Sequence, residues 1–502
     1  AARGGSGNGS AGEPPVPDAL VPLPDNEYLI DEAGRIIAGS STALVALLLD
    51  IKYNVAVDRF FAAAFFRSCT AFVDVAEVRR EVLGPVFDTL AQAAPPEGDP
   101  AAPAVAVSDM FSIKHVVSLM AEWGAQAPEY LKEGPIRTSL DELVGELQAA
   151  RLVPLAARLS AALDAVDASL PPSRFDLVAH TVGLWPEYGL QPPGLDATSR
   201  AQLLGLLDEF DPPTVAYALT ILEGVLFTRV DVHGELAGLA WSKPGRETAA
   251  PNVMLLIGLF NALSRWVVSA ALSHKSSAKA RGGVLTKFIE LADELRLLGN
   301  YSGVMEVVAG LSASEVKRTR KAWALVPKVA IAKHEVLKTL TGQAKSYKYL
   351  REALAISDLD HPPVPYLGMF LTDLTMIDDG NPTYLPSACG ALRLINVRKW
   401  RLLSAVHEEL IGHQDRFCEW AGVPRSRVPQ LPTPAARPVS DLPRLAPLVR
   451  AAPNPQATAA VLARLVLLLD PDILAPASPH ALLSADDAYE LSLELEPRRP
   501  RK

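Results

Sequence analysis

The residues from 366 to 382, YLGMFLTDLTMIDDGNP, combine small hydroxyls, acidic side chains and a Gly-Asn-Pro helix stop. Read as a helix, the segment places Thr372, Thr375 and Asp379 at positions i, i+3 and i+7, which lie on one face. That face could exchange hydrogen bonds with another molecule and bring a negative charge to it. A helix that only packs in a core has no need of hydroxyls ending in a carboxylate. The pattern therefore indicates a helix that is inserted into a partner.

Motifs of covalent catalysis and metal binding are missing from the sequence. It contains no GxSxG, HExxH or P-loop motif. The three cysteines, Cys69, Cys389 and Cys418, are far apart and have no CxxC or Cys/His ligand spacing. His407 and His413 are six residues apart, whereas the histidines of a helical metal pair are four apart. We therefore expect no covalent enzyme chemistry, no cofactor, no metal site and no disulfide framework.

The composition indicates a globular protein with more than one domain. The chain has 502 residues, of which 49% are hydrophobic and 21% charged, and its net charge is -9. The acidic balance argues against a nucleic-acid binder. The apolar runs are shorter than the roughly 20 residues that a membrane span needs. The first residues do not resemble a signal peptide, and no terminal cysteine motif encodes a lipid anchor. We expect a cytoplasmic protein.

Helical periodicity runs through most of the chain, and strand-like alternation is nearly absent. Apolar residues from Leu285 to Leu298 make one clear helical stripe. The sequence therefore predicts an all-α fold with two helical domains. We expect disorder at 1–27, a first domain at 28–165, a linker at 166–200, a second domain at 201–425, and a Pro-rich tail with one helix near Val461–Leu469 at 426–502.

Eight blocks in the second half of the chain carry a family resemblance. They lie at Phe210–Trp241, Leu259–Val267, Val284–Leu298, Asn300–Leu311, Val316–Val326, Ser346–Leu354, Tyr366–Pro382 and Leu394–Lys399. Their motifs, such as LFNALSRWV and NYSGVMEVVAGL, and their order resemble the catalytic (RasGEF) domain of Ras-type guanine nucleotide exchange factors. The first domain, with VDRFFAAAFFRSCTAFVDVAEVRREV at 57–82, resembles less tightly the Ras exchanger motif domain that commonly precedes it.

The resemblance implies an exchange factor that opens a Ras-family small GTPase (Ras, Rap or Ral type) with a protruding helical hairpin and without covalent chemistry. It implies that Asp379 competes for groups that bind phosphate and Mg²⁺. It also implies that the Thr375 methyl blocks the metal and that Thr372 hydrogen-bonds the displaced switch segment. Further GTPase-binding positions implied by the resemblance are Asp378, Asn381, Ser312, Ser314, Tyr347 and Lys399.

These positions also have purely structural interpretations. The acids could form a solvated helix end, and the threonines could pack against a neighbouring helix. The serines could cap helices, with Ser312 and Glu315 forming a capping box. Tyr347 could be a half-buried core aromatic and Lys399 a solvated charge. The basic run from Lys317 to Lys321 fits an exposed helix face.

Two departures from the family pattern leave a second hypothesis open. Asp379 is one methylene shorter than the Glu that commonly stands in relatives, and Gly258 stands where some relatives have Arg. The chain could therefore be an exchange-inactive scaffold of the same fold that binds GTPases. A third hypothesis, an unrelated helical hydrolase or repeat protein, has no supporting motif. We expect any membrane recruitment to be peripheral and to occur through partners.

Overall fold

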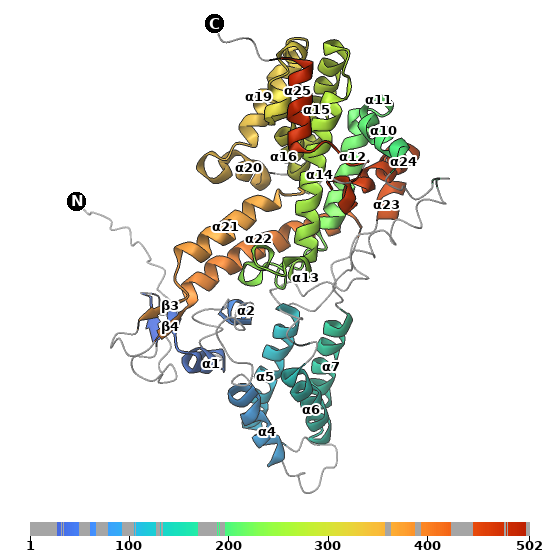
Figure 1. The fold of residues 1–502 in the computed structure, drawn as a ribbon. Coiled ribbons are helices and arrows are strands. Elements are labelled where there is room, and N and C mark those ends of the chain that lie inside the picture. The colour runs from blue at the N-terminus through green and yellow to red at the C-terminus, as the bar shows by residue number, and fades with distance from the viewer. Residues whose placement is uncertain are drawn as a thin grey trace, which may run out of the picture. The chain divides into compact units, whose positions relative to one another are not determined.

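The computed structural model describes residues 28–497 except 32, 34, 50–60, 67–78, 93–104, 106, 127–130, 132–133, 169–187, 189, 191–195, 357–362, 387–392, 423–444, 476–477 and 479. The disorder predicted at 1–27 and most of the linker predicted at 166–200 lie outside these residues. The chain forms two compact units (Figure 1). One comprises residues 1–123, 133–161 and 381–401, and the other comprises 124–132, 162–380 and 402–502.

Helices make up most of the first unit. They are α1 (Ser41–Leu49), α2 (Phe61–Phe66), a π-helical turn (Arg79–Leu83), α4 (Gly84–Ala91), α5 (Val107–Gln126), α6 (Pro135–Ala149) and α7 (Val153–Ala168), the last residues of α5 and α7 belonging to the second unit. Proline stands in the first turn of α4 and α6, where its missing N–H has no helical partner to lose. In α6, Ile136, Leu140, Leu143 and Leu147 are buried at helical spacing.

A four-stranded antiparallel sheet completes the first unit, in the order β1-β2-β4-β3. The strands are β1 (Tyr28–Ile30), β2 (Ile36–Gly39), β3 (Tyr384–Pro386) and β4 (Arg393–Asn396). The central pairing places Ala38 opposite Asn396 and Gly39 opposite Ile395. Segments from the two ends of this unit's sequence therefore share one ladder. The sequence does not predict these strands, because three or four residues are too short to show an alternating pattern.

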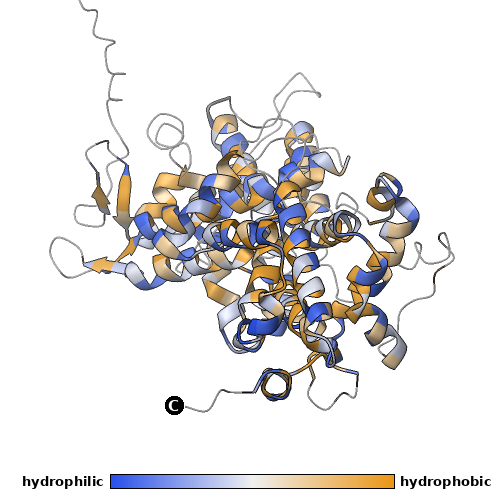
Figure 2. Ribbon diagram, turned by 90° about the horizontal axis from the view of Figure 1, so that it is seen from above, coloured by the Kyte–Doolittle hydropathy of each residue, from blue (hydrophilic) through white to orange (hydrophobic). Residues whose placement is uncertain are grey.

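The second unit is a helical domain. Up to residue 356 its helices are α10 (Ala197–Leu204), α11 (Leu206–Glu209), α12 (Pro212–Phe227), η5 (Ala237–Ser242), α13 (Arg246–Ala249), α14 (Pro251–Ser273), α15 (Ala278–Leu297), α16 (Tyr301–Ser312), α17 (Ser314–Lys317), α18 (Arg320–Trp323), α19 (Lys328–Leu340) and α20 (Ala344–Ile356). After them come α21 (Leu367–Gly380) and residues 402–420 of α22 (Val397–Trp420). Figure 2 shows hydrophobic and hydrophilic residues interspersed along the helices of the chain.

The core of the second unit lies between α12, α14, α15 and α16. Trp266 is fully buried there, and its indole Nε1 donates to the Leu203 carbonyl at 2.7 Å. The Trp266 ring meets Phe288 edge-on, with centroids 4.9 Å apart. The predicted stripe on α15 is confirmed: Leu285, Phe288, Ile289, Ala292 and Leu295 are all buried.

The last part of the chain holds more structure than the sequence predicts. The helices α23 (Leu445–Arg450), α24 (Pro455–Leu465) and α25 (Ala485–Leu495) and the 3₁₀ turns η7 (Val466–Leu469) and η8 (Pro471–Ile473) follow residue 444. Leu448, Leu462 and Leu468 belong to the same core as Trp266. The single helix predicted here underestimates this region because its helices are short and separated by prolines.

The described residues confirm the all-α prediction, with the small sheet as an addition. Among the residues that the structure describes, one helix, α14, is long and apolar enough to cross a membrane. Half of the apolar 18-residue stretch of α14 is buried inside the protein, and the helix contacts α15 and α16. These contacts are those of a core helix.

Candidate functional site

The predicted contact helix is present as α21 (Leu367–Gly380), and it ends at the Gly-Asn-Pro sequence as predicted. One side of the helix faces the core of the second unit through Leu367, Phe370, Leu371 and Leu374, which are spaced by three or four residues. The opposite side exposes Thr372, Met376 and Asp379, and Thr375 is half-buried at its edge. Met376 is 61% exposed, so this face also offers an apolar group.

The two threonine hydroxyls on α21 bond back to their own helix. Thr372 Oγ1 donates to the Gly368 carbonyl at 2.8 Å, and Thr375 Oγ1 donates to the Leu371 carbonyl at 2.9 Å. Their methyl groups and oxygen lone pairs stay available to a partner. In the described part of the chain the Asp379 carboxylate makes no hydrogen bond or ion pair, whereas Asp378 is half-buried and has a partner.

A salt bridge that the sequence did not indicate ties α21 to α20. Arg351 Nη2 donates to both carboxylate oxygens of Asp373, at 2.6 and 2.8 Å. Arg351 Nε also donates to the Ser346 carbonyl at 2.7 Å. One guanidinium therefore fixes both the middle of α21 and the start of α20.

The start of α20 has a strained backbone. Lys345, Ser346 and Tyr347 have φ values of 51°, 53° and 61°, in the left-handed region that non-glycine residues rarely adopt. Tyr347 is 8% exposed, and its ring lies 6.0 Å from that of Tyr366. Its position is that of a buried core aromatic. Burial and the neighbouring Tyr347 raise the pKa of Tyr366 to about 12, so this hydroxyl stays neutral.

The first turn of α14 is held by a side chain from outside the helix. The Glu235 carboxylate accepts from the backbone N–H groups of Asn252 and Val253, both at 2.8 Å, and from Asn252 Nδ2 at 2.6 Å. It therefore satisfies donors that a helix N-terminus leaves without partners. Burial raises the pKa of Glu235. This cap fixes the direction in which α14 leaves its first turn.

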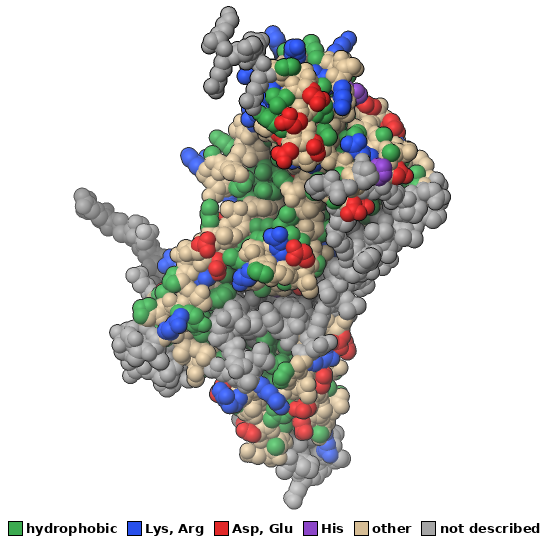
Figure 3. All heavy atoms as spheres, in the orientation of Figure 1, with side chains coloured by type: hydrophobic (Ala, Val, Ile, Leu, Met, Phe, Trp, Pro, Cys, Tyr) green, Lys and Arg blue, Asp and Glu red, His purple; other side chains and the backbone are tan. Residues whose placement is uncertain are grey.

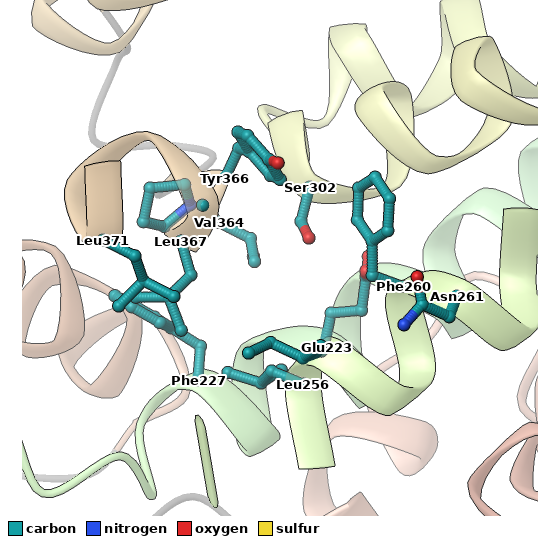
Figure 4. A pocket seen from close by; sticks show the side chains of 13 residues that line it. Glu223, Phe227, Leu256, Phe260, Asn261, Ser302, Val364, Tyr366, Leu367 and Leu371 are labelled. Atoms are coloured by element: carbon teal, nitrogen blue, oxygen red, sulfur yellow. The ribbon is translucent and has the colours of Figure 1, made fainter. Parts of the chain in front are cut away.

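A cavity of about 250 Å³ lies between α12, α14, α16 and the start of α21. Figure 4 shows Leu367 and Leu371 on one side of it and Phe260 on another, with the Glu223 carboxyl beside Phe260. Its other lining residues include Phe227, Leu256, Ile257, Asn261, Ser302, Val364 and Tyr366. Hydrophobic side chains gather on the face that carries α14 and the start of α21 (Figure 3). An apolar side chain of a partner fits such a cavity.

The two predicted serine positions lie at the junction of α16 and α17. Ser312 is the last residue of α16, and Ala313, without a side-chain hydrogen bond, is the N-cap of α17. The predicted capping box with Glu315 is therefore wrong. The helix restarts one residue later, so the Glu315 carboxylate instead accepts from Ser314 Oγ at 2.9 Å and lies 3.6 Å from Arg265. Ser314 is exposed and Ser312 half-buried.

Two predicted contact residues, Asn381 and Lys399, belong to the first unit. Asn381 is half-buried and has a partner. Lys399 is only 3% exposed, and its Nζ donates to Thr383 Oγ1 at 3.3 Å. The interpretation of Lys399 as a solvated charge is therefore wrong, and its role as a GTPase contact stays a prediction.

The sequence analysis did not identify side chains that pair with partners far away in the sequence. Arg351 and Asp373 are 22 positions apart and Glu223 and Asn300 are 77 apart, so no local motif joins either pair. Among the described residues, no three His, Cys, Asp or Glu side chains gather to hold a metal ion. The chemistry of this face is thus hydrogen bonding, negative charge and apolar contact.

Comparison with known proteins identifies a domain family in this part of the chain. Residues 214–401 match the family model described as the RasGEF domain. Ras guanine nucleotide exchange factor P of Dictyostelium discoideum is 33% identical over 197 residues, covering 39% of this chain and 13% of that protein. Ras guanine nucleotide exchange factor E of the same organism is 38% identical over 176 residues, covering 34% and 16%.

A human protein is similar to this chain to about the same extent. Ras-specific guanine nucleotide-releasing factor 1 is 32% identical over 196 residues, covering 39% of this chain and 15% of the human protein. The matched region spans less than a fifth of each of these relatives. The family-model match at residues 214–401 contains α21, the cavity and the serine junction. The chain therefore contains a RasGEF domain at residues 214–401 and is similar there to Ras-type guanine nucleotide exchange factors.

Proposed function

We propose that this chain accelerates GDP release from a Ras-family small GTPase and that α21 is the element that opens the GTPase. The observation that carries the proposal is the exposed face of α21. Thr372, Met376 and Asp379 stand on a helix whose other side is locked into the core. The RasGEF match and the names of the relatives support the class of partner. The reaction makes and breaks no covalent bond.

Contacts made by α21 have to supply the free energy that speeds nucleotide release. A 10⁵-fold faster release corresponds to roughly 7 kcal/mol, at about 1.4 kcal/mol per factor of ten. Prying a switch segment away from the nucleotide is one adequate lever. A carboxylate about 4 Å from a phosphate is another, worth roughly 4 kcal/mol at an effective dielectric constant of 20.

Asp379 supplies the negative charge in this proposal. It is exposed at the end of α21 and has no partner among the described residues, so it is free to meet groups that bind phosphate and Mg²⁺. The Thr375 methyl, one helical turn earlier, occupies the metal's space. Thr372 accepts a hydrogen bond from the displaced switch, since its own O–H is already donated to Gly368.

The cavity supplies the apolar part of the contact. Its lining includes Ile257, Phe260 and Leu371, and Met376 is exposed farther along α21. A buried apolar side chain stabilises a complex by roughly 1.5–3 kcal/mol. Insertion of one GTPase side chain therefore adds to the stability of the nucleotide-free complex. Ser312 and Ser314 extend the contact as hydrogen-bonding positions.

A second candidate function is a scaffold that binds a GTPase without accelerating exchange. Two features favour it: the short reach of Asp379 and the absence of a side chain at Gly258 on α14. The two functions differ in one measurement. A scaffold forms a stable complex with nucleotide-free GTPase and leaves the rate of GDP release unchanged.

Release of fluorescent GDP from a panel of Ras, Rap and Ral GTPases tests the proposal. We expect faster release from at least one GTPase at micromolar concentrations of the chain. A panel in which every rate equals the intrinsic rate, with complex formation intact, selects the scaffold. A panel with neither acceleration nor binding refutes both functions.

A further inference from the structure

Two carboxyl groups are buried together beside the cavity. Glu223 comes from α12 and Glu306 from α16, and each is 1% exposed. No Lys or Arg in the described part of the chain forms an ion pair with either of them. A buried carboxylate without a cation is costly, because burial disfavours the charged form. The pair therefore needs another source of compensation.

The hydrogen bonds around the pair leave one oxygen of each carboxyl group without a donor. Asn300 Nδ2 donates to Glu223 Oε2, and Ser302 Oγ donates to Glu306 Oε1 at 3.3 Å. Glu223 Oε1 and Glu306 Oε2 are buried and receive no hydrogen bond from these donors. Burial and the Glu223 charge raise the pKa of Glu306, so the two carboxyl groups influence each other. A proton held between them gives a donor to one carboxyl and relieves the repulsion of two like charges.

The neighbouring groups are nearly all neutral. Thr220 of α12 and Ser264 of α14 are hydroxyls, and α15 contributes Leu295. The Tyr366 hydroxyl beside Glu306 stays protonated, since its pKa is raised to about 12. The charge of the Glu223–Glu306 pair therefore depends on how many protons the pair binds and on how well water reaches it.

Two protonation steps belong to this pair. Burial raises the pKa of Glu223 to about 7, against the hydrogen bond from Asn300. Burial and the charge of Glu223 raise the pKa of Glu306 well above its usual range. Near neutral pH the pair thus holds one proton firmly and exchanges a second with solvent.

Glu223 also lines the cavity, on the side of Phe260 (Figure 4). An apolar side chain that fills the cavity expels water and makes the Glu223 charge still less favourable. We propose that seating a GTPase side chain in this cavity is coupled to uptake of one solvent proton by the Glu223–Glu306 pair. This inference rests on the proposed function. The number of protons on the Glu223–Glu306 pair therefore changes when the cavity is filled.

The sign of the effect follows from linkage. Because the complex holds more protons than the free chain, affinity for the nucleotide-free GTPase falls as pH rises. The fall is at most tenfold per pH unit for one proton and occurs in the window above neutral pH where Glu223 is ionised in the free chain. Below this window the pair is protonated in the free chain as well, so the dependence of affinity on pH weakens as pH falls.

Calorimetry counts the protons directly. Nucleotide-free GTPase is titrated with the chain at pH 7.5 in two buffers that differ in ionisation enthalpy. We expect wild type to take up about half a proton or more relative to Glu223→Gln. Glutamine keeps an acceptor for Asn300 and adds an N–H donor toward Glu306. Glu306→Gln is the second variant, and Glu290→Gln, an exposed glutamate on α15, is the control with wild-type uptake.

Equal proton uptake by wild type, Glu223→Gln and Glu306→Gln overturns the inference. A chain that binds no GTPase at any pH refutes the proposed function and the coupling with it. The two failures are distinguished by infrared spectra of the free chain between pH 5 and 9. A protonated-carboxyl band that titrates near neutral pH and is lost in Glu223→Gln establishes the proton site without a GTPase, and its absence overturns the site.

Discussion

The Arg351–Asp373 salt bridge gives a prediction about how firmly α21 is held. In this account the helix can open a GTPase only if it resists the reaction force, and Arg351 is the polar group that fixes it to α20. Replacing Arg351 with Ala removes the bond to Asp373 and the bond to the Ser346 carbonyl together. We expect α21 to open more often and the exchange rate to fall.

The structure sets the size of this effect. The side chains of Arg351 and Asp373 are 32% and 23% exposed, so solvent weakens their interaction only in part. Hydrogen bonds to charged groups are worth about 1.5–3 kcal/mol when buried. With this exposure we expect about 1–2 kcal/mol, which corresponds to roughly 5- to 30-fold more frequent opening. Lys348 and Glu352, on the same helix, are 49% and 53% exposed and 3.6 Å apart, and should contribute little.

Hydrogen–deuterium exchange of peptides from residues 367–380 measures the opening of α21. We expect faster amide exchange in Arg351→Ala and Asp373→Asn, and a double variant little worse than either single one. The matched control Lys348→Ala should exchange like wild type. Exchange of α21 that is unchanged in Arg351→Ala, or single effects that simply add in the double variant, would refute the anchoring role.

Three further predictions concern single positions. Replacing Gly224 with Ala should destabilise the protein by about 1–3 kcal/mol, because the new Cβ would lie 2.0 Å from the Phe417 ring; an unchanged melting temperature would contradict the packing. Burial lowers the pKa of His413 to about 4 from 6.5, so the unfolded chain binds more protons in that window and stability rises with pH. His413→Gln should flatten this rise in urea unfolding, and equal slopes would be the contrary result. Gly258→Arg should raise the melting temperature, since a helix-interior Gly costs about 1 kcal/mol and nothing lies within 4 Å of its Cβ position; a lower melting temperature would count against open space there.

The contact helix could be predicted because its information is local. Leu367, Phe370, Leu371 and Leu374 repeat at helical spacing, and that repeat fixes which residues are left on the exposed face. The end of the helix at Gly380 is likewise predicted by the adjacent residues Asn381 and Pro382. The same local pattern gave the stripe on α15 from Leu285 to Leu295. Local periodicity thus predicted most of the helices and the all-α class.

The rest depends on contacts between distant residues. The pairing of Ala38 with Asn396 joins two short strands that carry no alternation, so sequence could not predict it. Lys399 reads as a surface charge, and only the fold shows that it is enclosed beside Thr383. Glu223 and Glu306 look like ordinary helical acids until packing removes both from water. In each case tertiary burial decided the role of the residue.

We propose that the exposed face of α21 accelerates GDP release. The release rate of fluorescent GDP from a responsive GTPase, measured with Asp379→Ala and Thr375→Arg, tests this role. Glu290→Ala removes an exposed acid elsewhere, and Thr339→Arg changes a threonine of α19 with the same hydrogen bond to the fourth preceding carbonyl.

Thr375→Arg should abolish acceleration, and Asp379→Ala should slow release by about tenfold or more, equivalent to about 1.4 kcal/mol. Both controls should match wild type. Wild-type rates in both α21 variants, with the fold intact, would contradict the account.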